Sequence, residues 1–307
     1  MKKFIVDIFK FCFITCLFYV VLLIVWGEFF PSFMKKNLNY KLGDTGHMHT
    51  RLKEVKKQSD VDILFLGSSL TYRGYDTRLF QNEGYKTFNL GSSSQTPIQS
   101  LLLTKRYLKK LNPELVFCQV DPEAFSADGV ESSLDLIAND TNDKFSLEMA
   151  YTIGNLKTIN AFTFGCYRDL FNRNENFKEE PIKNGDQYIV GGYVAKDMSF
   201  ACAKLIANYE FKFSKNQKKS FEEMLSIMDE NEVNYLLIYP PVSSEAYEAC
   251  KNIAYFDSCM HSYGNYINYN KNIKLNDSLD FYDAYHLNQL GVQKFNKMVI
   301  ENLNIVK

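Results

Sequence analysis

A serine, a histidine and an aspartate in this chain have the types and the spacing that nucleophilic catalysis requires. Gly67-Ser68-Ser69 follows a short apolar run, and Asp283 and His286 lie three residues apart near the end of the chain. A serine hydroxyl is a poor nucleophile unless a histidine takes its proton and a carboxylate orients that histidine. A turn can hold Asp283 against one imidazole nitrogen while the other nitrogen faces the serine. Taken alone, a Ser-Ser pair after a strand more often forms a turn or a helix cap.

The two serines fall where a parallel sheet presents its ligands. The run Val61-Asp62-Ile63-Leu64-Phe65-Leu66 is typical of a buried parallel strand. It stops at Gly67, so Ser68 and Ser69 follow the carboxyl end of the strand. Open α/β sheets bind their ligands at this edge.

The next segments repeat the same arrangement. Tyr85 to Leu90 is a second expected strand, which ends at Gly91, and Leu115 to Val120 is a third, which ends at Asp121-Pro122. Successive strand–helix units of this kind predict a doubly wound parallel sheet. We expect the amide of Gly91 to lie beside the nucleophile and to donate to an oxyanion, with a plain turn glycine as the alternative.

The rest of the chain completes one α/β domain, expected over residues 61–307. Val233 to Tyr239 is a further buried strand, and Asn288 is expected to cap the final helix. From about 128 to 197 the pattern becomes irregular, with a helical piece around Leu147 to Phe171. We expect this segment to be a helical insertion that covers the site.

These residues resemble the sequence blocks of the SGNH (GDSL-like) hydrolase superfamily. The blocks are Gly67-Ser68-Ser69-Leu70, Gly91, and Asp283-x-x-His286-Leu287-Asn288-x-x-Gly291, in that chain order. The resemblance implies a flavodoxin-like three-layer α/β/α fold. It also implies that Ser69 is the nucleophile, that Asp283 and His286 complete the triad, and that the amides of Ser69 and Gly91 receive the oxyanion.

The chain departs from the SGNH pattern at the third block. The family places an asparagine there, whose side chain donates to the oxyanion, whereas this chain has Val120-Asp121-Pro122. A carboxylate would repel an oxyanion unless it is paired, and we name Arg73 as the candidate partner. Asp121 and Arg73 are therefore expected to be substrate-binding residues.

The amino terminus predicts a membrane anchor. From Phe11 to Gly27 there are 17 uncharged residues, about 25 Å of helix against a hydrocarbon layer of about 30 Å. A cleaved signal peptide is the alternative, but bulky residues follow the apolar run where small residues usually mark the cleavage site. We expect residues 1–36 to be a transmembrane signal-anchor, 37–60 to be a connector, and the catalytic domain to lie outside the cytoplasm.

Composition excludes several other classes of function. The 35 Lys and Arg against 36 Asp and Glu give a net charge of −1, so nucleic acid is not an expected partner. No cofactor or metal is expected, because His47-Met48-His49 lacks further ligands at a suitable spacing and is more typical of a surface loop. The connector is expected to place Arg51 on a solvated helix face.

The anchored layout resembles the membrane-tethered SGNH-like proteins that handle acyl groups on cell-envelope polymers. Examples are the D-alanyl transfer protein of teichoic acids and the alginate O-acetylation proteins. We therefore expect a serine esterase or O-acyltransferase that acts on a cell-surface glycan, with a membrane-bound acyltransferase as a further candidate partner. The alternative is a catalytically weak SGNH-fold protein that binds a glycan or helps to assemble such a partner.

Overall fold

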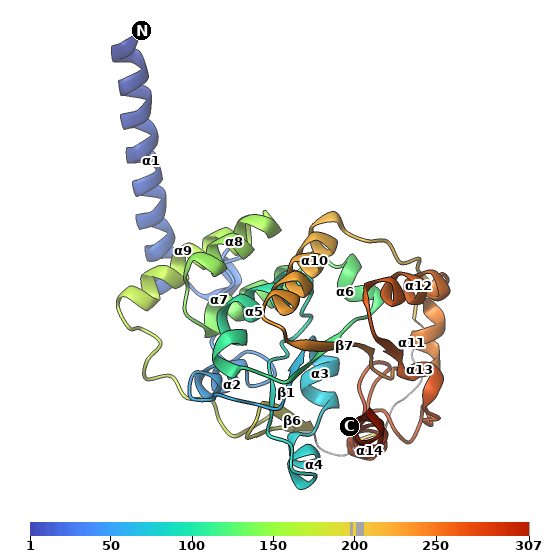
Figure 1. The fold of residues 1–307 in the computed structure, drawn as a ribbon. Coiled ribbons are helices and arrows are strands. Elements are labelled where there is room, and N and C mark those ends of the chain that lie inside the picture. The colour runs from blue at the N-terminus through green and yellow to red at the C-terminus, as the bar shows by residue number, and fades with distance from the viewer. Residues whose placement is uncertain (197–198, 201–205, 307) are drawn as a thin grey trace.

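The computed structural model describes residues 1–196, 199–200 and 206–306. At its centre, five parallel strands lie in the order β2-β1-β3-β7-β8 (Figure 1). The strand order runs in two directions from β1, so the sheet is doubly wound and the predicted fold class is confirmed. The strands are β1 (Ile63–Leu66), β2 (Thr87–Asn89), β3 (Leu115–Gln119), β7 (Asn234–Tyr239) and β8 (Tyr266–Asn268).

Both faces of this sheet are buried. Side chains alternate across a strand, and in β1 Leu64 and Leu66 join one hydrophobic cluster while Ile63 and Phe65 join another. The continuous apolar run of β1 therefore follows from helices that cover the sheet on both sides.

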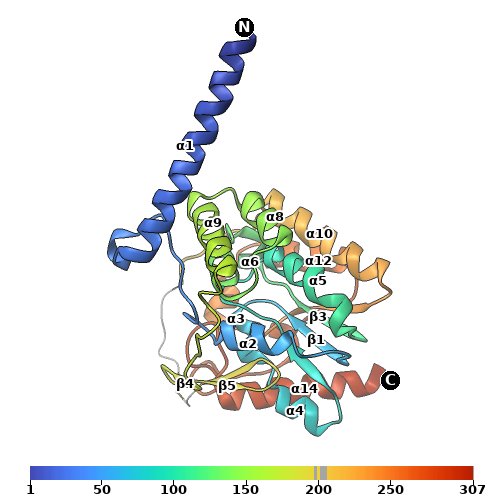
Figure 2. The ribbon, with the colours of Figure 1, turned by 90° about the vertical axis from the view of Figure 1, so that its left-hand side faces the viewer.

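The helices form a layer on each face of the sheet (Figures 1 and 2). One layer includes α5 (Pro97–Leu111), α10 (Lys215–Glu230), α11 (Ser244–Ala249) and α12 (Ile253–Tyr263). The other is built around α4 (Thr77–Asn82) and α14 (Gln289–Val306). Shorter helices follow several strands at their carboxyl ends: α3 (Ser69–Gly74), α6 (Pro122–Ser126) and α13 (Tyr269–Asn272).

The expected insertion contains helices and also a small sheet. Its helices are α7 (Val130–Asn139), α8 (Lys144–Ile153) and α9 (Leu156–Leu170). An antiparallel sheet follows, formed by β4 (Ile182–Lys183), β5 (Asp186–Ile189) and β6 (Tyr193–Lys196). The described part of the segment expected as a helical insertion therefore contains three helices and, in addition, three short strands. These strands have only two to four residues each, and β4 and β5 are partly exposed, so they lack the apolar run that marks a buried strand.

The amino terminus forms one long helix, α1 (Lys2–Phe29), which projects from the domain (Figure 1). Among the described residues it is the one helix that is long and apolar enough to cross a membrane. A short 3-10 turn, η1 (Ser32–Met34), follows it. Helices α8 and α9 of the insertion lie near the end of α1 that joins the domain (Figures 1 and 2).

The connector is packed into the domain through helix α2 (Met48–Val55). Arg51, expected on a solvated face, is fully buried. Its guanidinium donates to the carbonyls of Gly46 (2.8 Å), Gly91 (2.7 Å) and Gly192 (2.9 Å), which replace water as its partners. His47 and His49 are also buried rather than part of a surface loop.

Candidate active site

The nucleophile is positioned by the turn between β1 and α3. Ser68 is the N-cap of α3, and its hydroxyl accepts from the amide of Leu70 (3.3 Å). Ser69 is the first residue of the helix. The turn needs a glycine before it, because a side chain on Gly67 would overlap the side chains of Thr71 and Gln119.

The structure brings Ser69, His286 and Asp283 together. The Oγ of Ser69 lies 2.7 Å from Nε2 of His286. Nδ1 of His286 lies 2.8 and 2.9 Å from the two carboxylate oxygens of Asp283. When Nδ1 carries the proton and donates to Asp283, Nε2 is free to accept the proton of Ser69.

The triad carboxylate is held by its own loop. Oδ1 of Asp283 accepts from the amides of Tyr285 and His286, both at 2.8 Å. Burial alone would raise the pKa of Asp283, but the bonds and charge of His286, together with these amides, hold the pKa below its usual value. Asp283 is therefore ionised at neutral pH and can stabilise an imidazolium.

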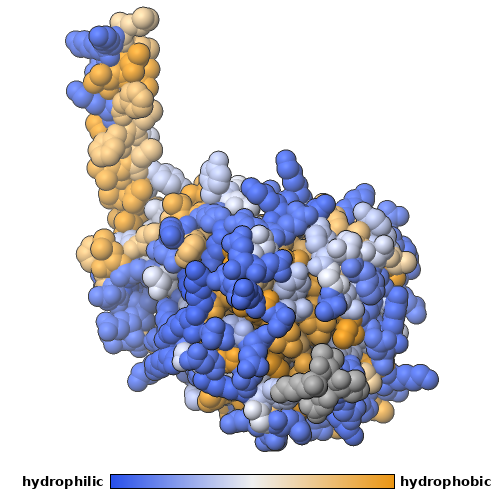
Figure 3. Space-filling model, in the orientation of Figure 1, coloured by the Kyte–Doolittle hydropathy of each residue, from blue (hydrophilic) through white to orange (hydrophobic). Residues whose placement is uncertain are grey.

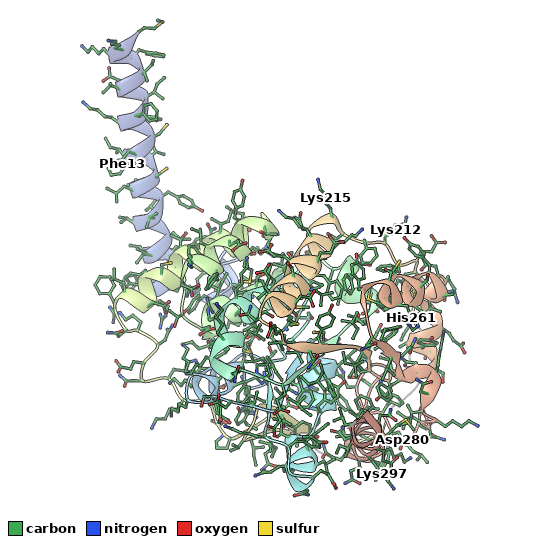
Figure 4. The ribbon with its side chains drawn as sticks, in the orientation of Figure 1. Phe13, Lys212, Lys215, His261, Asp280 and Lys297 are labelled. Carbon is green, nitrogen blue, oxygen red and sulfur yellow. The ribbon has the colours of Figure 1, made fainter. Side chains whose placement is uncertain are left out.

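The loop that carries Asp283 and His286 is anchored to the start of α14. Asp280 is fully buried and pairs with Lys294 at 2.7 Å, and its carbonyl accepts from the amide of Asn288 (2.9 Å). Figure 4 shows Asp280 beside α14. Asn288 in turn accepts from the amides of Leu290 and Gly291, which agrees with its expected capping role.

Gly91 lies beside the nucleophile turn, but its amide is engaged. It donates to Oδ1 of Asn89 at 3.0 Å. The structure thus provides no free Gly91 N–H for an oxyanion, which corrects the expectation. A side chain at Gly91 would meet the carbonyl of Ser68 at 2.9 Å and the amide of Tyr72 at 3.0 Å, so the glycine is needed for close packing against the turn.

Asp121 and Arg73 both border the site, but they do not pair with each other. Arg73 forms two bonds of 2.7 Å with the carboxylate of Asp186. Asp121 caps α6 by accepting from the amide of Ala124 (2.9 Å) and also accepts from Nε2 of Gln119 (2.8 Å). Burial raises the pKa of Asp121, against the hydrogen bonds that lower it. The expected Arg73–Asp121 pairing is wrong.

Gln119 is a positioning residue that the sequence analysis missed. Its Oε1 accepts from the amide of Ser68 (2.7 Å) and from the hydroxyl of Thr71 (2.6 Å). Its Nε2 donates to Oγ of Ser68 (2.8 Å). One side chain at the end of β3 therefore fixes the turn that carries Ser69. The only signal in the sequence is a glutamine that ends an apolar strand.

Two cavities meet at Ser69 and His286. One, of about 280 Å³, contains Asp121 and the rings of Tyr209, Tyr239 and Tyr285 in its wall. The other, of about 350 Å³, is lined by charged and polar groups that include Arg73, Lys183 and Asp186, together with the rings of Tyr72 and Tyr282. The Tyr282 ring stacks on the imidazole of His286, with centroids 5.3 Å apart.

The described residues contain no group of three or more side chains that could hold a metal ion. His261, the remaining histidine outside the connector and the site, is exposed on α12 (Figure 4).

Comparison with known proteins found similar solved structures at low sequence identity. No family model and no curated protein matches the chain. The chain is similar to a Bacteroides fragilis protein assigned as an acylhydrolase (TM-score 0.44, 11% identity, 86% of this chain and 98% of the other). It is also similar to a GDSL-like lipase from Bacteroides thetaiotaomicron (TM-score 0.43, 13% identity, 84% and 98%). A third similar structure is a Clostridium thermocellum family 3 carbohydrate esterase (TM-score 0.35, 13% identity, 80% and 97%).

Proposed function

We propose that this protein is an SGNH-type serine esterase or O-acyltransferase that acts on acyl groups of a cell-surface polysaccharide through an acyl-Ser69 intermediate. The observation that carries the proposal is the geometry of the triad. Ser69 Oγ lies 2.7 Å from one imidazole nitrogen of His286, and Asp283 holds the other nitrogen. This arrangement activates a hydroxyl as a nucleophile.

The chemistry takes place in two half-reactions. Ser69 Oγ attacks the carbonyl carbon of an ester while His286 takes the hydroxyl proton, and the tetrahedral oxyanion forms beside the amino end of α3. His286 then gives the proton to the departing alcohol, which leaves the acyl group on Ser69. Water or a sugar hydroxyl next attacks this ester, again with His286 as base, and releases an acid or a new ester together with free Ser69.

We infer that the amide of Ser69 donates to the oxyanion. As the first residue of α3, Ser69 has no acceptor for its N–H within the helix, and none is found among the described residues. The helix dipole adds little in so short a helix, so backbone geometry is the main contribution.

The two cavities support transfer between two bulky groups. Because Ser69 and His286 line both cavities, an acyl group and an alcohol can reach the serine from different sides. The polar cavity offers two tyrosine rings together with charged side chains, a combination that suits the face and the hydroxyls of a sugar. The long apolar helix α1 supports a role at the cell envelope, where such polymers lie.

A second candidate function is a weakly catalytic protein that binds a glycan or assembles with a membrane acyltransferase. It is favoured by the engaged amide of Gly91 and by the Asp121 carboxylate where the SGNH pattern has an asparagine. Both features reduce the stabilisation of an oxyanion, and the loss of one donor typically costs about 10²–10³ in rate.

Labelling of the full chain in detergent with a fluorophosphonate tests the proposal. We expect one adduct on Ser69 by peptide mass spectrometry, no adduct in Ser69→Ala, and at least about a hundredfold slower labelling in His286→Ala. The matched control is Ser68→Ala, which removes the neighbouring hydroxyl and a helix cap but leaves the nucleophile. An adduct on Ser68, or no adduct on the folded wild-type chain, would move the assignment away from acyl chemistry at Ser69 and toward the binding function.

A further inference from the structure

The last turns of α1 are packed against α9. Tyr19 donates to Oδ1 of Asn160 (2.7 Å), and Glu28 pairs with Arg168 at 3.1 Å. Leu23 and Gly27 are the buried residues of α1 between them. A side chain at Gly27 would overlap the ring of Phe164, so the glycine lets the two helices approach closely.

Only the part of α1 before Tyr19 projects beyond these contacts with α9. Before Tyr19, the uncharged part of α1 is Phe11–Phe18, eight residues, or about 12 Å of helix. Figure 4 shows Phe13 on this projecting part. A hydrocarbon layer needs about 30 Å. Extending the span toward the amino terminus would place Lys10 and Asp7 in the hydrocarbon, which is strongly unfavourable.

If α1 crosses the membrane, the rest of the ~30 Å must therefore come from the segment of α1 that packs against α9 on one side. The stretch Phe11–Phe30 has 20 residues and spans about 30 Å. It carries one charge, on Glu28, which is paired with Arg168. The seam from Tyr19 to Glu28 then lies within the half of the bilayer that is nearer the domain, and α9 lies beside it.

The outward surface of α9 has the composition that such a position requires. Leu156, Ile159 and Leu170 are exposed, and their spacing of three and eleven residues places them along one side of the helix. Thr163 lies between them, and its hydroxyl donates to the carbonyl of Ile159 (2.9 Å), so no polar group on this stripe lacks a partner. Figure 3 shows apolar surface that continues from α1 to its foot on the domain.

We propose that α9 is embedded in the membrane–water interface beside α1, with its exposed stripe of Leu156, Ile159 and Leu170 against lipid acyl chains. The occupant of this surface is lipid. To span the bilayer, α1 must have its Tyr19–Glu28 segment among the lipids, and the α9 stripe lies beside that segment. Amphipathic helices of this kind lie about 5–10 Å into the headgroup and acyl boundary. The inference rests on the proposed membrane anchoring, and it adds a second contact that fixes the orientation of the domain.

Quenching of tryptophan fluorescence by brominated lipid tests the proposal. Trp26 is the sole tryptophan of the chain, so a Trp26→Phe background allows one reporter at a time. Ile159→Trp reports on the α9 stripe, and Lys297→Trp is the control on α14, at the end of the domain opposite α1 (Figure 4). The full chain is reconstituted in phosphatidylethanolamine and phosphatidylglycerol vesicles with a phosphatidylcholine brominated near the headgroup end of its chains. Near-ultraviolet circular dichroism of each variant reports whether the domain is folded, independently of any reactivity of Ser69.

The expected result is the loss of about half or more of the emission for Ile159→Trp, since the side chain reaches the acyl boundary, and no loss for Lys297→Trp. The unaltered chain separates membrane anchoring by α1 from embedding of α9, because quenching of Trp26 reports on α1 alone. If Trp26 is quenched and Ile159→Trp is not, α1 spans the membrane but the α9 proposal is overturned. A blue-shifted but unquenched Ile159→Trp would point to a protein contact. Equal quenching of Ile159→Trp and Lys297→Trp would mean non-specific adsorption of the domain and would overturn the α9 proposal. No quenching of Trp26 would contradict membrane anchoring by α1.

Discussion

At the residue scale, Asp121 is the feature of the site that most opposes the proposed chemistry. Its carboxylate lies in the wall of a cavity that Ser69 also lines, and a negative charge there opposes a developing oxyanion. We expect Asp121→Asn to accelerate fluorophosphonate labelling of Ser69 by about tenfold or more, because one good donor is worth about 10²–10³ in rate. The rate of adduct formation by mass spectrometry measures this.

The matched control for Asp121→Asn is Glu123→Gln, which removes a carboxylate from the same cavity but not at the end of β3. Equal acceleration by both variants would assign the effect to general charge rather than to position. Slower labelling in Asp121→Asn on a folded protein would contradict the prediction. That outcome would mean that the hydrogen bonds of Asp121 to Ala124 and Gln119 matter more than its charge.

The residues of the triad could be predicted from sequence, whereas their supports could not. Ser69, Asp283 and His286 follow from residue type, chain order and the end of an apolar strand. The role of Gln119 depends on β1 and β3 being neighbours in register, with Leu66 opposite Cys118, and a single sequence does not give that register. The engagement of the Gly91 amide by Asn89 likewise depends on a side-chain orientation that spacing does not determine.

At the element scale, helix α7 carries a buried carboxyl group whose titration affects stability. Asp135 accepts from Nδ2 of Asn139 (3.0 Å) through one oxygen, and its other oxygen has no partner among the described residues. Burial raises the pKa of Asp135 to about 7, although nearby Arg51 lowers it. In the folded protein this group is therefore protonated at pH values where it is ionised in the unfolded chain.

The pH dependence of stability follows from this shift. Below about pH 4 both states carry the proton, and as the pH rises to about 7 the unfolded state loses it first. The contribution of Asp135 to the free energy of unfolding therefore falls across that window, by an amount on the order of a few kcal/mol. We expect Asp135→Asn to remove this fall and to be more stable than the wild type at pH 8, as measured by urea unfolding.

Urea unfolding of Asp229→Asn, an exposed aspartate on α10, should follow the wild-type pH profile. If Asp135→Asn is instead less stable than the wild type at pH 8, the ionised carboxylate must be favourable beside Arg51, and the prediction fails.

The elements that could be predicted are those whose pattern reflects burial on both sides. β1, β3 and β7 are apolar runs that end at a turn, so their position and their parallel pairing follow from the sequence. Strand β8 has only three residues and includes Asn268, so it gives no such run. The sequence predicts an exposed Arg51, because a charged residue on a helix normally faces water. In the structure it is buried, and three carbonyl groups accept from its guanidinium.

At the scale of the whole molecule, the seam between α1 and α9 joins the projecting helix to the α/β domain. Gly27→Leu introduces a side chain that overlaps the ring of Phe164. We expect the seam to loosen, and amide hydrogen exchange in α9 to become at least several-fold faster in the full chain in detergent micelles, because local opening costs less free energy. Labelling of Ser69 should be unchanged, since the seam lies apart from the triad.

The control for Gly27→Leu is Val21→Leu, which enlarges an exposed side chain of the same helix and should leave exchange in α9 unaltered. If hydrogen exchange in α9 is as slow in Gly27→Leu as in Val21→Leu, the two helices are not packed together in solution, and the prediction fails. The domain would then be linked to α1 by the chain alone, without a fixed packing contact.

The residues of the candidate triad come from opposite ends of the chain. Ser69 and His286 are 217 residues apart in sequence but share one hydrogen bond. A nascent chain that ends before residue 283 already carries Ser69 but lacks both Asp283 and His286, so its serine has no base to activate it. Under the proposed function, the serine becomes reactive only after the last segment of the chain has been made and has folded against the turn that carries Ser69.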